Sequence, residues 1–408
     1  MNEEFFKFMN IIDSLAVYKN LKNNELIKNV YELLRIFCFE EKNHTNFLKT
    51  KKLYSKICDL VWSHPSCNLS DYIYELILYD ENIISRNGEM HAEVVDAAVK
   101  EFNELIELAL GLKSKLITSY IYAKYIQLIS DIGYLPYYAT RESFENPTYE
   151  EVIKFYTEHG YGKFAKSNAF SFDDDCELKP ITNADDISFD MLKLYNREKE
   201  LVYKNTEAFI ENRPYHNVLL HGDRGCGKSS VVKAAANHFA NRGLRIIQIK
   251  KDNLKNFDKL VEYLSGSILK FIIFIDDLSF NDNDDEFNAL KAALEGALQK
   301  RPENIAIYAT SNRYHLVKEY FSAREGDEIH LSDTVNEICS LSDRFGLIIN
   351  YSSPTMMDYL EIVKLLAKDN QLDINEETLL KNAETFALER GSRSPRIAKQ
   401  YITELCNR

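Results

Sequence analysis

The sequence predicts an α/β fold in which a parallel sheet is flanked by helices, with a small helical lid after it and an all-helical domain before it. Two observations predict the sheet. A glycine-rich segment stands between an expected strand and an expected helix, and two later apolar segments each end in polar side chains. A third observation, helical periodicity over residues 1–165, predicts the helical domain. With 408 residues, the chain is long enough for two or three domains.

Residues 1–165 repeat apolar side chains at the three- and four-residue spacing of amphipathic helices. The clearest example is Leu26, Val30, Leu33 and Phe37. We expect five to seven helices here. Because the region carries no chemical motif, we assign it the binding of a protein partner. The next segment, residues 166–186, is polar and acidic, and we expect it to be a linker.

The segment GDRGCGKS, residues 222–229, matches the phosphate-binding pattern G-x-x-x-x-G-K-[ST]. Its glycines let backbone N–H groups face phosphate oxygens, Lys228 adds a full positive charge, and the Ser229 hydroxyl can ligate Mg²⁺. An expected strand precedes the loop and an expected helix follows it, which is the context of a P-loop NTPase. The predicted nucleotide-binding residues are Gly222, Asp223, Arg224, Gly225, Cys226, Gly227, Lys228, Ser229 and Ser230.

Polar side chains follow the next two expected strands. Residues 268–275 form a nearly unbroken apolar run, typical of a central parallel strand, that ends at Asp276 and Asp277. Ligands of such sheets bind at the carboxyl ends of the strands. Asp276 is therefore the expected metal ligand, and Asp277 the residue that orients or deprotonates the attacking water. The alternative, that both aspartates begin a solvated acidic loop, stays open because more acidic residues follow. The strand over 305–309 precedes Asn312, which we expect between the metal site and the γ-phosphate.

The order of five segments resembles the AAA+ ATPases, and most closely the bacterial family catalogued as domain of unknown function 815. The segments are GDRGCGKSS, FIIFIDDLSF, YATSNR, SLSDRFG and GSRSPRIAKQ. By this resemblance Asn312 matches the sensor 1 residue, Arg344 the arginine finger that reaches a neighbouring subunit's γ-phosphate, and Arg396 the sensor 2 arginine of the lid. Taken alone, Arg344 also fits an ion-pair partner and Arg396 a solvated helix residue.

The resemblance implies a core over residues 187–352, a lid over 353–408, ATP and Mg²⁺ as cofactors, and a homo-oligomer in which Arg344 acts in trans. It also implies an adenine contact at Leu194 and Tyr195. Cys226 stands where the family usually has threonine, and we expect a small neutral loop residue there rather than a redox switch.

The family usually has Asp-Glu where this chain has Asp276-Asp277. We therefore expect ATP hydrolysis that is slow or depends on a partner. Three functions stay open. The favoured one is an ATPase that remodels or regulates a protein partner. The others are a DNA-associated ATPase like helicase loaders or initiators, and a nucleotide-regulated scaffold with little hydrolysis.

Composition bears on the partners and the compartment. The net charge of −13 opposes nonspecific attraction to nucleic acid, so DNA is not favoured. The seven cysteines form no CxxC pair, as expected for reduced thiols in a cytoplasmic protein. No apolar segment approaches the length of a membrane span and the start is not a signal peptide, so we expect no membrane partner.

Overall fold

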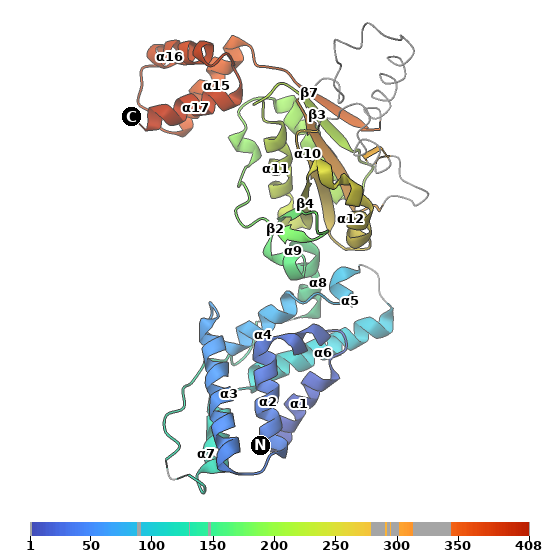
Figure 1. The fold of residues 1–408 in the computed structure, drawn as a ribbon, viewed down its shortest axis with the longest axis vertical. Helices are drawn as coiled ribbons and strands as arrows, with labels where there is room; N and C mark the ends of the chain where they lie inside the picture. Colours follow the sequence, from blue (N-terminus) through green and yellow to red (C-terminus); the bar gives the residue numbers. More distant parts are fainter. Residues whose placement is uncertain are drawn as a thin grey trace. The chain divides into compact units, whose positions relative to one another are not determined.

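The computed structural model describes residues 2–87, 91–129, 131–145, 148–278, 290, 291, 294, 302–312 and 344–407. They divide into two compact units, Met1–Lys166 and Ser167–Arg408. Figure 1 shows the helices and strands of each unit. The acidic residues Asp282, Asp284, Asp285 and Glu286 and the polar stretch 322–343 lie outside the described residues.

The first unit is helical, as predicted. Its described residues form nine α-helices and one 3₁₀ helix: α1 Asn2–Ser14, η1 Lys19–Asn23, α2 Glu25–Phe39, α3 His44–Ser63, α4 Leu69–Leu78, α5 Ile83–Arg86, α6 Ala92–Gly111, α7 Ser114–Tyr125, α8 Tyr149–His159 and α9 Gly162–Lys166. The predicted five to seven helices were too few. The helices α5 and α9 have only 4 and 5 residues, too short for a periodic pattern to reveal them.

Helix α2 shows why this unit folds locally as the pattern predicts. The Asn24 side chain caps its start by accepting a hydrogen bond from the Leu26 N–H at 2.8 Å. Leu26, Val30, Leu33 and Phe37 lie on one face of the helix and are at most 3% exposed. This apolar stripe packs α2 against α1 and α3.

The second unit is built on a seven-stranded sheet in the order β2-β1-β4-β5-β6-β3-β7. The strands are β1 Ala169–Phe172, β2 Leu178–Pro180, β3 Val218–Gly222, β4 Leu244–Ile249, β5 Lys270–Ile275, β6 Ile305–Ser311 and β7 Leu347–Tyr351. Neighbouring strands are parallel except β1 and β2, which pair antiparallel. The predicted parallel sheet is therefore present, with an added antiparallel edge.

The prediction of a linker over residues 166–186 was wrong. Residues 169–172 and 178–180 are the strands β1 and β2, and β1 pairs with β4. Phe170 and Phe172 are 0% and 3% exposed, so this segment belongs to the core of the second unit. Strands of 4 and 3 residues around an acidic turn are too short to show a period-two pattern.

Helices cover the sheet and connect its strands (Figure 1). They are α10 Asn196–Ile210, α11 Lys228–His238 and α12 Phe257–Leu264, with the 3₁₀ helices η2 Phe189–Met191, η3 Ala240–Arg242 and η4 Lys251–Asn256. Because β3, β5 and β6 are parallel, with His221 opposite Ser311 and Ile275 opposite Ala309, their carboxyl ends lie at the same edge of the sheet. The phosphate-binding loop and the polar residues after β5 and β6 all begin there.

Three helices follow β7, in the segment that the sequence predicts to be a lid: α15 Met356–Asp369, α16 Glu376–Glu389 and α17 Pro395–Cys406. They share an apolar cluster that includes Tyr359, Val363, Ala383 and Ala398, all 0% exposed. In the part of the chain that the structure describes, no helix combines the length and apolarity needed to cross a bilayer.

Candidate nucleotide-binding site

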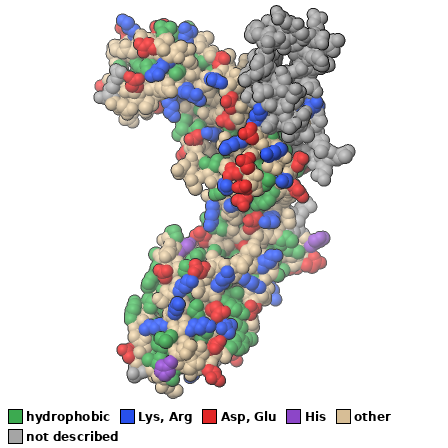
Figure 2. Space-filling view, viewed as in Figure 1, with side chains coloured by type: hydrophobic (Ala, Val, Ile, Leu, Met, Phe, Trp, Pro, Cys, Tyr) green, Lys and Arg blue, Asp and Glu red, His purple; other side chains and the backbone are tan. Residues whose placement is uncertain are grey.

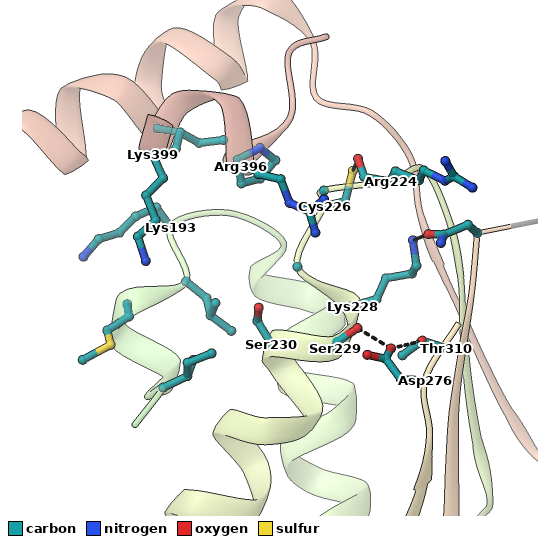
Figure 3. A pocket seen from close by; sticks show the side chains of 18 of the residues that line it. Lys193, Arg224, Cys226, Lys228, Ser229, Ser230, Asp276, Thr310, Arg396 and Lys399 are labelled. Carbon is teal, nitrogen blue, oxygen red and sulfur yellow. Dashed lines mark hydrogen bonds between the residues drawn. The ribbon is translucent and has the colours of Figure 1, made fainter. Parts of the chain in front are cut away.

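A cavity of about 620 Å³ lies over the carboxyl edge of the sheet, between the phosphate-binding loop and the lid (Figure 3). Its volume is in the range typical of small-molecule sites. The residues that line it are Ile187, Met191, Leu192, Lys193, Arg224, Gly225, Cys226, Gly227, Lys228, Ser229, Ser230, Asp276, Asp277, Thr310, Asn312, Ile362, Leu366, Pro395, Arg396 and Lys399. The cavity thus brings together predicted site residues from four separate segments of the sequence: the phosphate-binding loop, Asp276 and Asp277, Asn312, and Arg396.

Close packing explains the glycines of the loop. Gly222 has φ +124°, and a Cβ there would lie 2.3 Å from the Tyr351 carbonyl oxygen. Gly225 has φ +78°, and a Cβ there would lie 2.7 Å from the Ser394 Oγ at the start of α17. Both positions therefore exclude a side chain on conformational and steric grounds. The second contact also brings the lid directly against the loop.

Lys228 opens helix α11 and is 6% exposed. Its Nζ donates to the carbonyl oxygens of Gly222 at 2.8 Å and Asp223 at 2.7 Å, and to the Asn312 Oδ1 at 3.0 Å. Burial lowers the pKa of Lys228 from its usual value, against smaller opposing contributions from nearby acidic groups. These three acceptors carry no net charge, so the charge of the ammonium group is available to a bound anion.

Ser229 and Asp276 lie together, as a shared metal site requires. The Ser229 Oγ donates to the Asp276 Oδ1 at 2.6 Å, and the Thr310 Oγ1 donates to the same oxygen at 2.6 Å (Figure 3). A hydroxyl and a carboxylate beside a phosphate-binding loop are the hard oxygen donors that Mg²⁺ takes from proteins. The donor set therefore fits Mg²⁺.

Asp277 and Asn312 are in direct contact. The Asn312 Nδ2 donates to the Asp277 Oδ1 at 2.6 Å. Asp277 has φ +55°, in the left-handed region that aspartate visits more readily than most residues. Through its two amide atoms, Asn312 links Asp277 to Lys228.

The two arginines lie in different places. Arg396 lines the cavity, and its side chain extends from α17 towards the loop (Figure 3). Its backbone N–H donates to the Gly225 carbonyl oxygen at 3.3 Å. Arg344 does not line the cavity. It precedes β7, whose first residue Leu347 is opposite Val218 at the start of β3. Arg344 is thus at the amino edge of the sheet, roughly 16 Å, the length of a five-residue strand, from the edge where the phosphate-binding loop begins.

The adenine contact expected at Leu194 and Tyr195 stays a prediction. The Tyr195 hydroxyl donates to the Ser352 carbonyl oxygen at 2.6 Å, and Leu194 packs against the lid cluster. Neither residue lines the cavity. The apolar lining instead comes from residues 187–192 and from Ile362 and Leu366 of the lid. Residues 187–192 form a short irregular segment with a three-residue 3₁₀ helix, which leaves no periodic signal in the sequence.

Two loop residues have roles that the motif does not reveal. The Asp223 carboxylate accepts the Ser353 N–H at 2.7 Å, which ties the loop to the segment leading into the lid and lowers the pKa of Asp223. Cys226 is 2% exposed, and burial raises the pKa of its thiol. A raised pKa keeps the thiol protonated, as expected of a neutral packing residue.

Residues 165–408 match the family described as "Protein of unknown function (DUF815)". An AAA-ATPase of Arabidopsis thaliana is 26% identical over 218 residues, which cover 50% of this chain and 44% of the relative. The Holliday junction branch migration complex subunit RuvB of Mycoplasmopsis pulmonis is 27% identical over 208 residues, which cover 49% and 59%. The chain thus spans about half the length of the curated relatives it matches.

Two solved structures of RuvB from Thermotoga maritima are among those similar to this chain. A variant of that protein aligns with a TM-score of 0.36 and 18% identity, over 54% of this chain and 62% of the other. The structure titled as its Holliday junction branch migration motor aligns with a TM-score of 0.33 and 17% identity, over 53% and 72%.

Proposed function

The chain belongs to the DUF815 family of AAA+ ATPases, and we propose that it binds ATP with Mg²⁺ in the cavity over the sheet and hydrolyses it to change the state of a protein partner. The observation that carries the proposal is the hydrogen-bonded set formed by Lys228, Asn312 and Asp277 beside the Ser229–Asp276 pair. Phosphoryl transfer needs a cation at the phosphates, a metal ligand and a carboxylate near the attacking water, and these residues supply all three.

Each residue has a distinct task in the proposed reaction. Lys228 and the loop N–H groups bind the β- and γ-phosphates. Mg²⁺, held by Ser229 and Asp276, would neutralise part of the phosphate charge. Asp277 orients the attacking water and accepts its proton, while Asn312 holds the Asp277 carboxylate in place.

Two arginines complete the proposed site. Arg396 reaches the phosphates from the lid, so nucleotide binding would hold the lid against the loop. Arg344, at the amino edge of the sheet, is proposed to serve the site of an adjacent copy of this chain, where a guanidinium can meet charge spread over the γ-phosphate oxygens. The protein would then be a homo-oligomer, and turnover would depend on assembly.

The helical first unit is proposed to bind the protein partner in the cytoplasm. Large aromatic side chains are exposed on this unit, with Tyr134 at 78%, Tyr137 at 53% and Trp62 at 48%. Exposed Tyr and Trp are typical of protein interfaces. The Asp277 side chain is shorter than the glutamate usual at this position, so ATP hydrolysis by the isolated chain would be slow. Binding of the partner to the first unit would then increase the rate of hydrolysis.

A DNA-associated ATPase is the second candidate, because one relative is named as a Holliday junction branch migration complex subunit. Two observations weigh against it. The net charge is −13, and Figure 2 shows acidic and basic side chains intermingled on the visible face of each unit. Stimulation of ATP turnover by a synthetic four-way junction or by linear duplex DNA would favour this candidate over a protein remodeller.

Phosphate release from ATP by the full chain tests the proposal. We expect turnover with Mg²⁺, none with EDTA, and loss of turnover in Asp276→Ala. Asp258→Ala is the matched control, because Asp258 is an exposed aspartate on α12 that does not line the cavity. If wild-type protein binds ATP tightly but releases no phosphate with Mg²⁺, with or without DNA, the nucleotide-regulated scaffold is the correct function.

A further inference from the structure

We infer that Thr310 is a positioning residue for the proposed ATPase: its hydroxyl orients the Asp276 carboxylate and holds the backbone of Asp277. Neither the phosphate-binding motif nor the family resemblance assigns a role to this residue. The inference rests on the proposed function. It specifies which group orients the Asp276 carboxylate and which group holds the Asp277 backbone in the proposed ATPase site.

Thr310 is near the end of β6, is 2% exposed and lines the cavity. Its Oγ1 donates to the Asp276 Oδ1 at 2.6 Å and accepts the Asp277 N–H at 2.9 Å. A hydroxyl has one proton and can also accept, so both capacities are used here. Valine, which has the same shape, could make neither contact.

The first contact orients a metal ligand. The Asp276 Oδ1 accepts from both Ser229 and Thr310 (Figure 3). When Ser229 turns its hydroxyl oxygen to a cation, Thr310 still holds Oδ1 and therefore the plane of the carboxylate. Groups that hydrogen-bond a metal ligand in this way fix its orientation and contribute to metal affinity.

The second contact supports an uncommon backbone conformation. Asp277 has φ +55°, which costs a residue other than glycine free energy unless its surroundings hold it there. Thr310 supplies two bonds to this turn: its Oγ1 accepts the Asp277 N–H, and its carbonyl oxygen accepts the Leu278 N–H at 2.7 Å. The turn aims the Asp277 carboxylate at Asn312. Aspartate tolerates this conformation better than most residues, which gives a reason for Asp-Asp at this strand end.

The test compares Thr310→Ser with Thr310→Ala, because both lack the methyl group and only the serine variant keeps the hydroxyl. Mn²⁺ binding to the full chain with ADP, followed by electron paramagnetic resonance, reports on the metal site without turnover. We expect Thr310→Ala to bind Mn²⁺ roughly 10- to 100-fold more weakly than Thr310→Ser. The kcat for ATP should fall by a similar factor, while ATP affinity in EDTA stays the same in both variants.

Ser311→Ala is the matched control. Ser311 is buried beside Thr310 at 1% exposure, and its hydroxyl proton is donated to the Leu278 carbonyl oxygen at 2.8 Å rather than to an aspartate. We expect its Mn²⁺ affinity to match wild type. Thermal melting of each variant shows whether it is folded. Equal Mn²⁺ binding and equal kcat in Thr310→Ser and Thr310→Ala would overturn this inference alone. Absence of ATP binding in wild-type protein would instead overturn the proposed function.

Discussion

The Asn312 side chain joins Asp277 to Lys228: its Nδ2 donates to the Asp277 Oδ1 at 2.6 Å, and its Oδ1 accepts from the Lys228 Nζ at 3.0 Å. The amide therefore contacts both the cation proposed to bind the phosphates and the carboxylate proposed to act on water. A phosphate that draws Lys228 away would break the bond between the Lys228 Nζ and the Asn312 Oδ1, and would thereby change how Asn312 holds Asp277. Binding of a phosphate group at Lys228 would thus be coupled to the position of the Asp277 carboxylate through the Asn312 side chain.

Asp277→Asn should preserve the fold and ATP affinity while lowering turnover by roughly 10²- to 10⁴-fold, the usual contribution of a positioned general base. Asparagine has the same shape and tolerates the left-handed backbone at φ +55°, but it cannot accept a proton from water. Single-turnover hydrolysis and equilibrium ATP binding separate the two effects. Unchanged single-turnover rates would remove Asp277 from the reaction.

A fragment of residues 167–408 should fold and bind ATP, whereas a fragment of residues 187–408 should be much less stable. The shorter fragment lacks β1, so it loses Phe170 and Phe172 and exposes the edge of β4. Removing a buried phenylalanine side chain costs about 3–5 kcal/mol. Urea denaturation of both fragments, with Phe170→Ala in the longer one, measures the difference. Equal stability of the two fragments would show that β1 does not belong to the core.

The parts of the fold that sequence reasoning predicted correctly share a physical cause. A central strand such as β5 is buried on both faces and reads as an apolar run, so its carboxyl end could be located at Asp276. Short strands such as β1 give no such signal. The contacts of Thr310 depend on the register that sets Ile275 opposite Ala309, which spacing along the chain does not reveal. The apolar lining from residues 187–192 was missed because that segment is irregular.

Arg344→Ala should leave ATP affinity nearly unchanged and lower turnover, by up to roughly 10³- to 10⁵-fold as for other arginine fingers. The reason is its place at the amino edge of the sheet, away from the cavity of its own chain. Mixing Arg344→Ala with Lys228→Ala should restore part of the activity, because some interfaces then pair an intact loop with an intact finger. No recovery on mixing, together with turnover per chain that is constant on dilution, would exclude a shared site.

The central claim is that the phosphate-binding loop holds ATP through Lys228, and calorimetric titration of ATP into wild-type and Lys228→Ala protein tests it most directly. Lys233→Ala is the control, because Lys233 is on the same helix but pairs with Asp185 at 2.6 Å and does not line the cavity. Lys228→Ala removes the hydrogen bonds between the Lys228 ammonium group and the phosphates of ATP. Their loss, worth about 3 kcal/mol, should weaken ATP binding roughly 100-fold. We expect wild-type affinity in Lys233→Ala. Equal affinity in Lys228→Ala and wild-type protein would contradict the account.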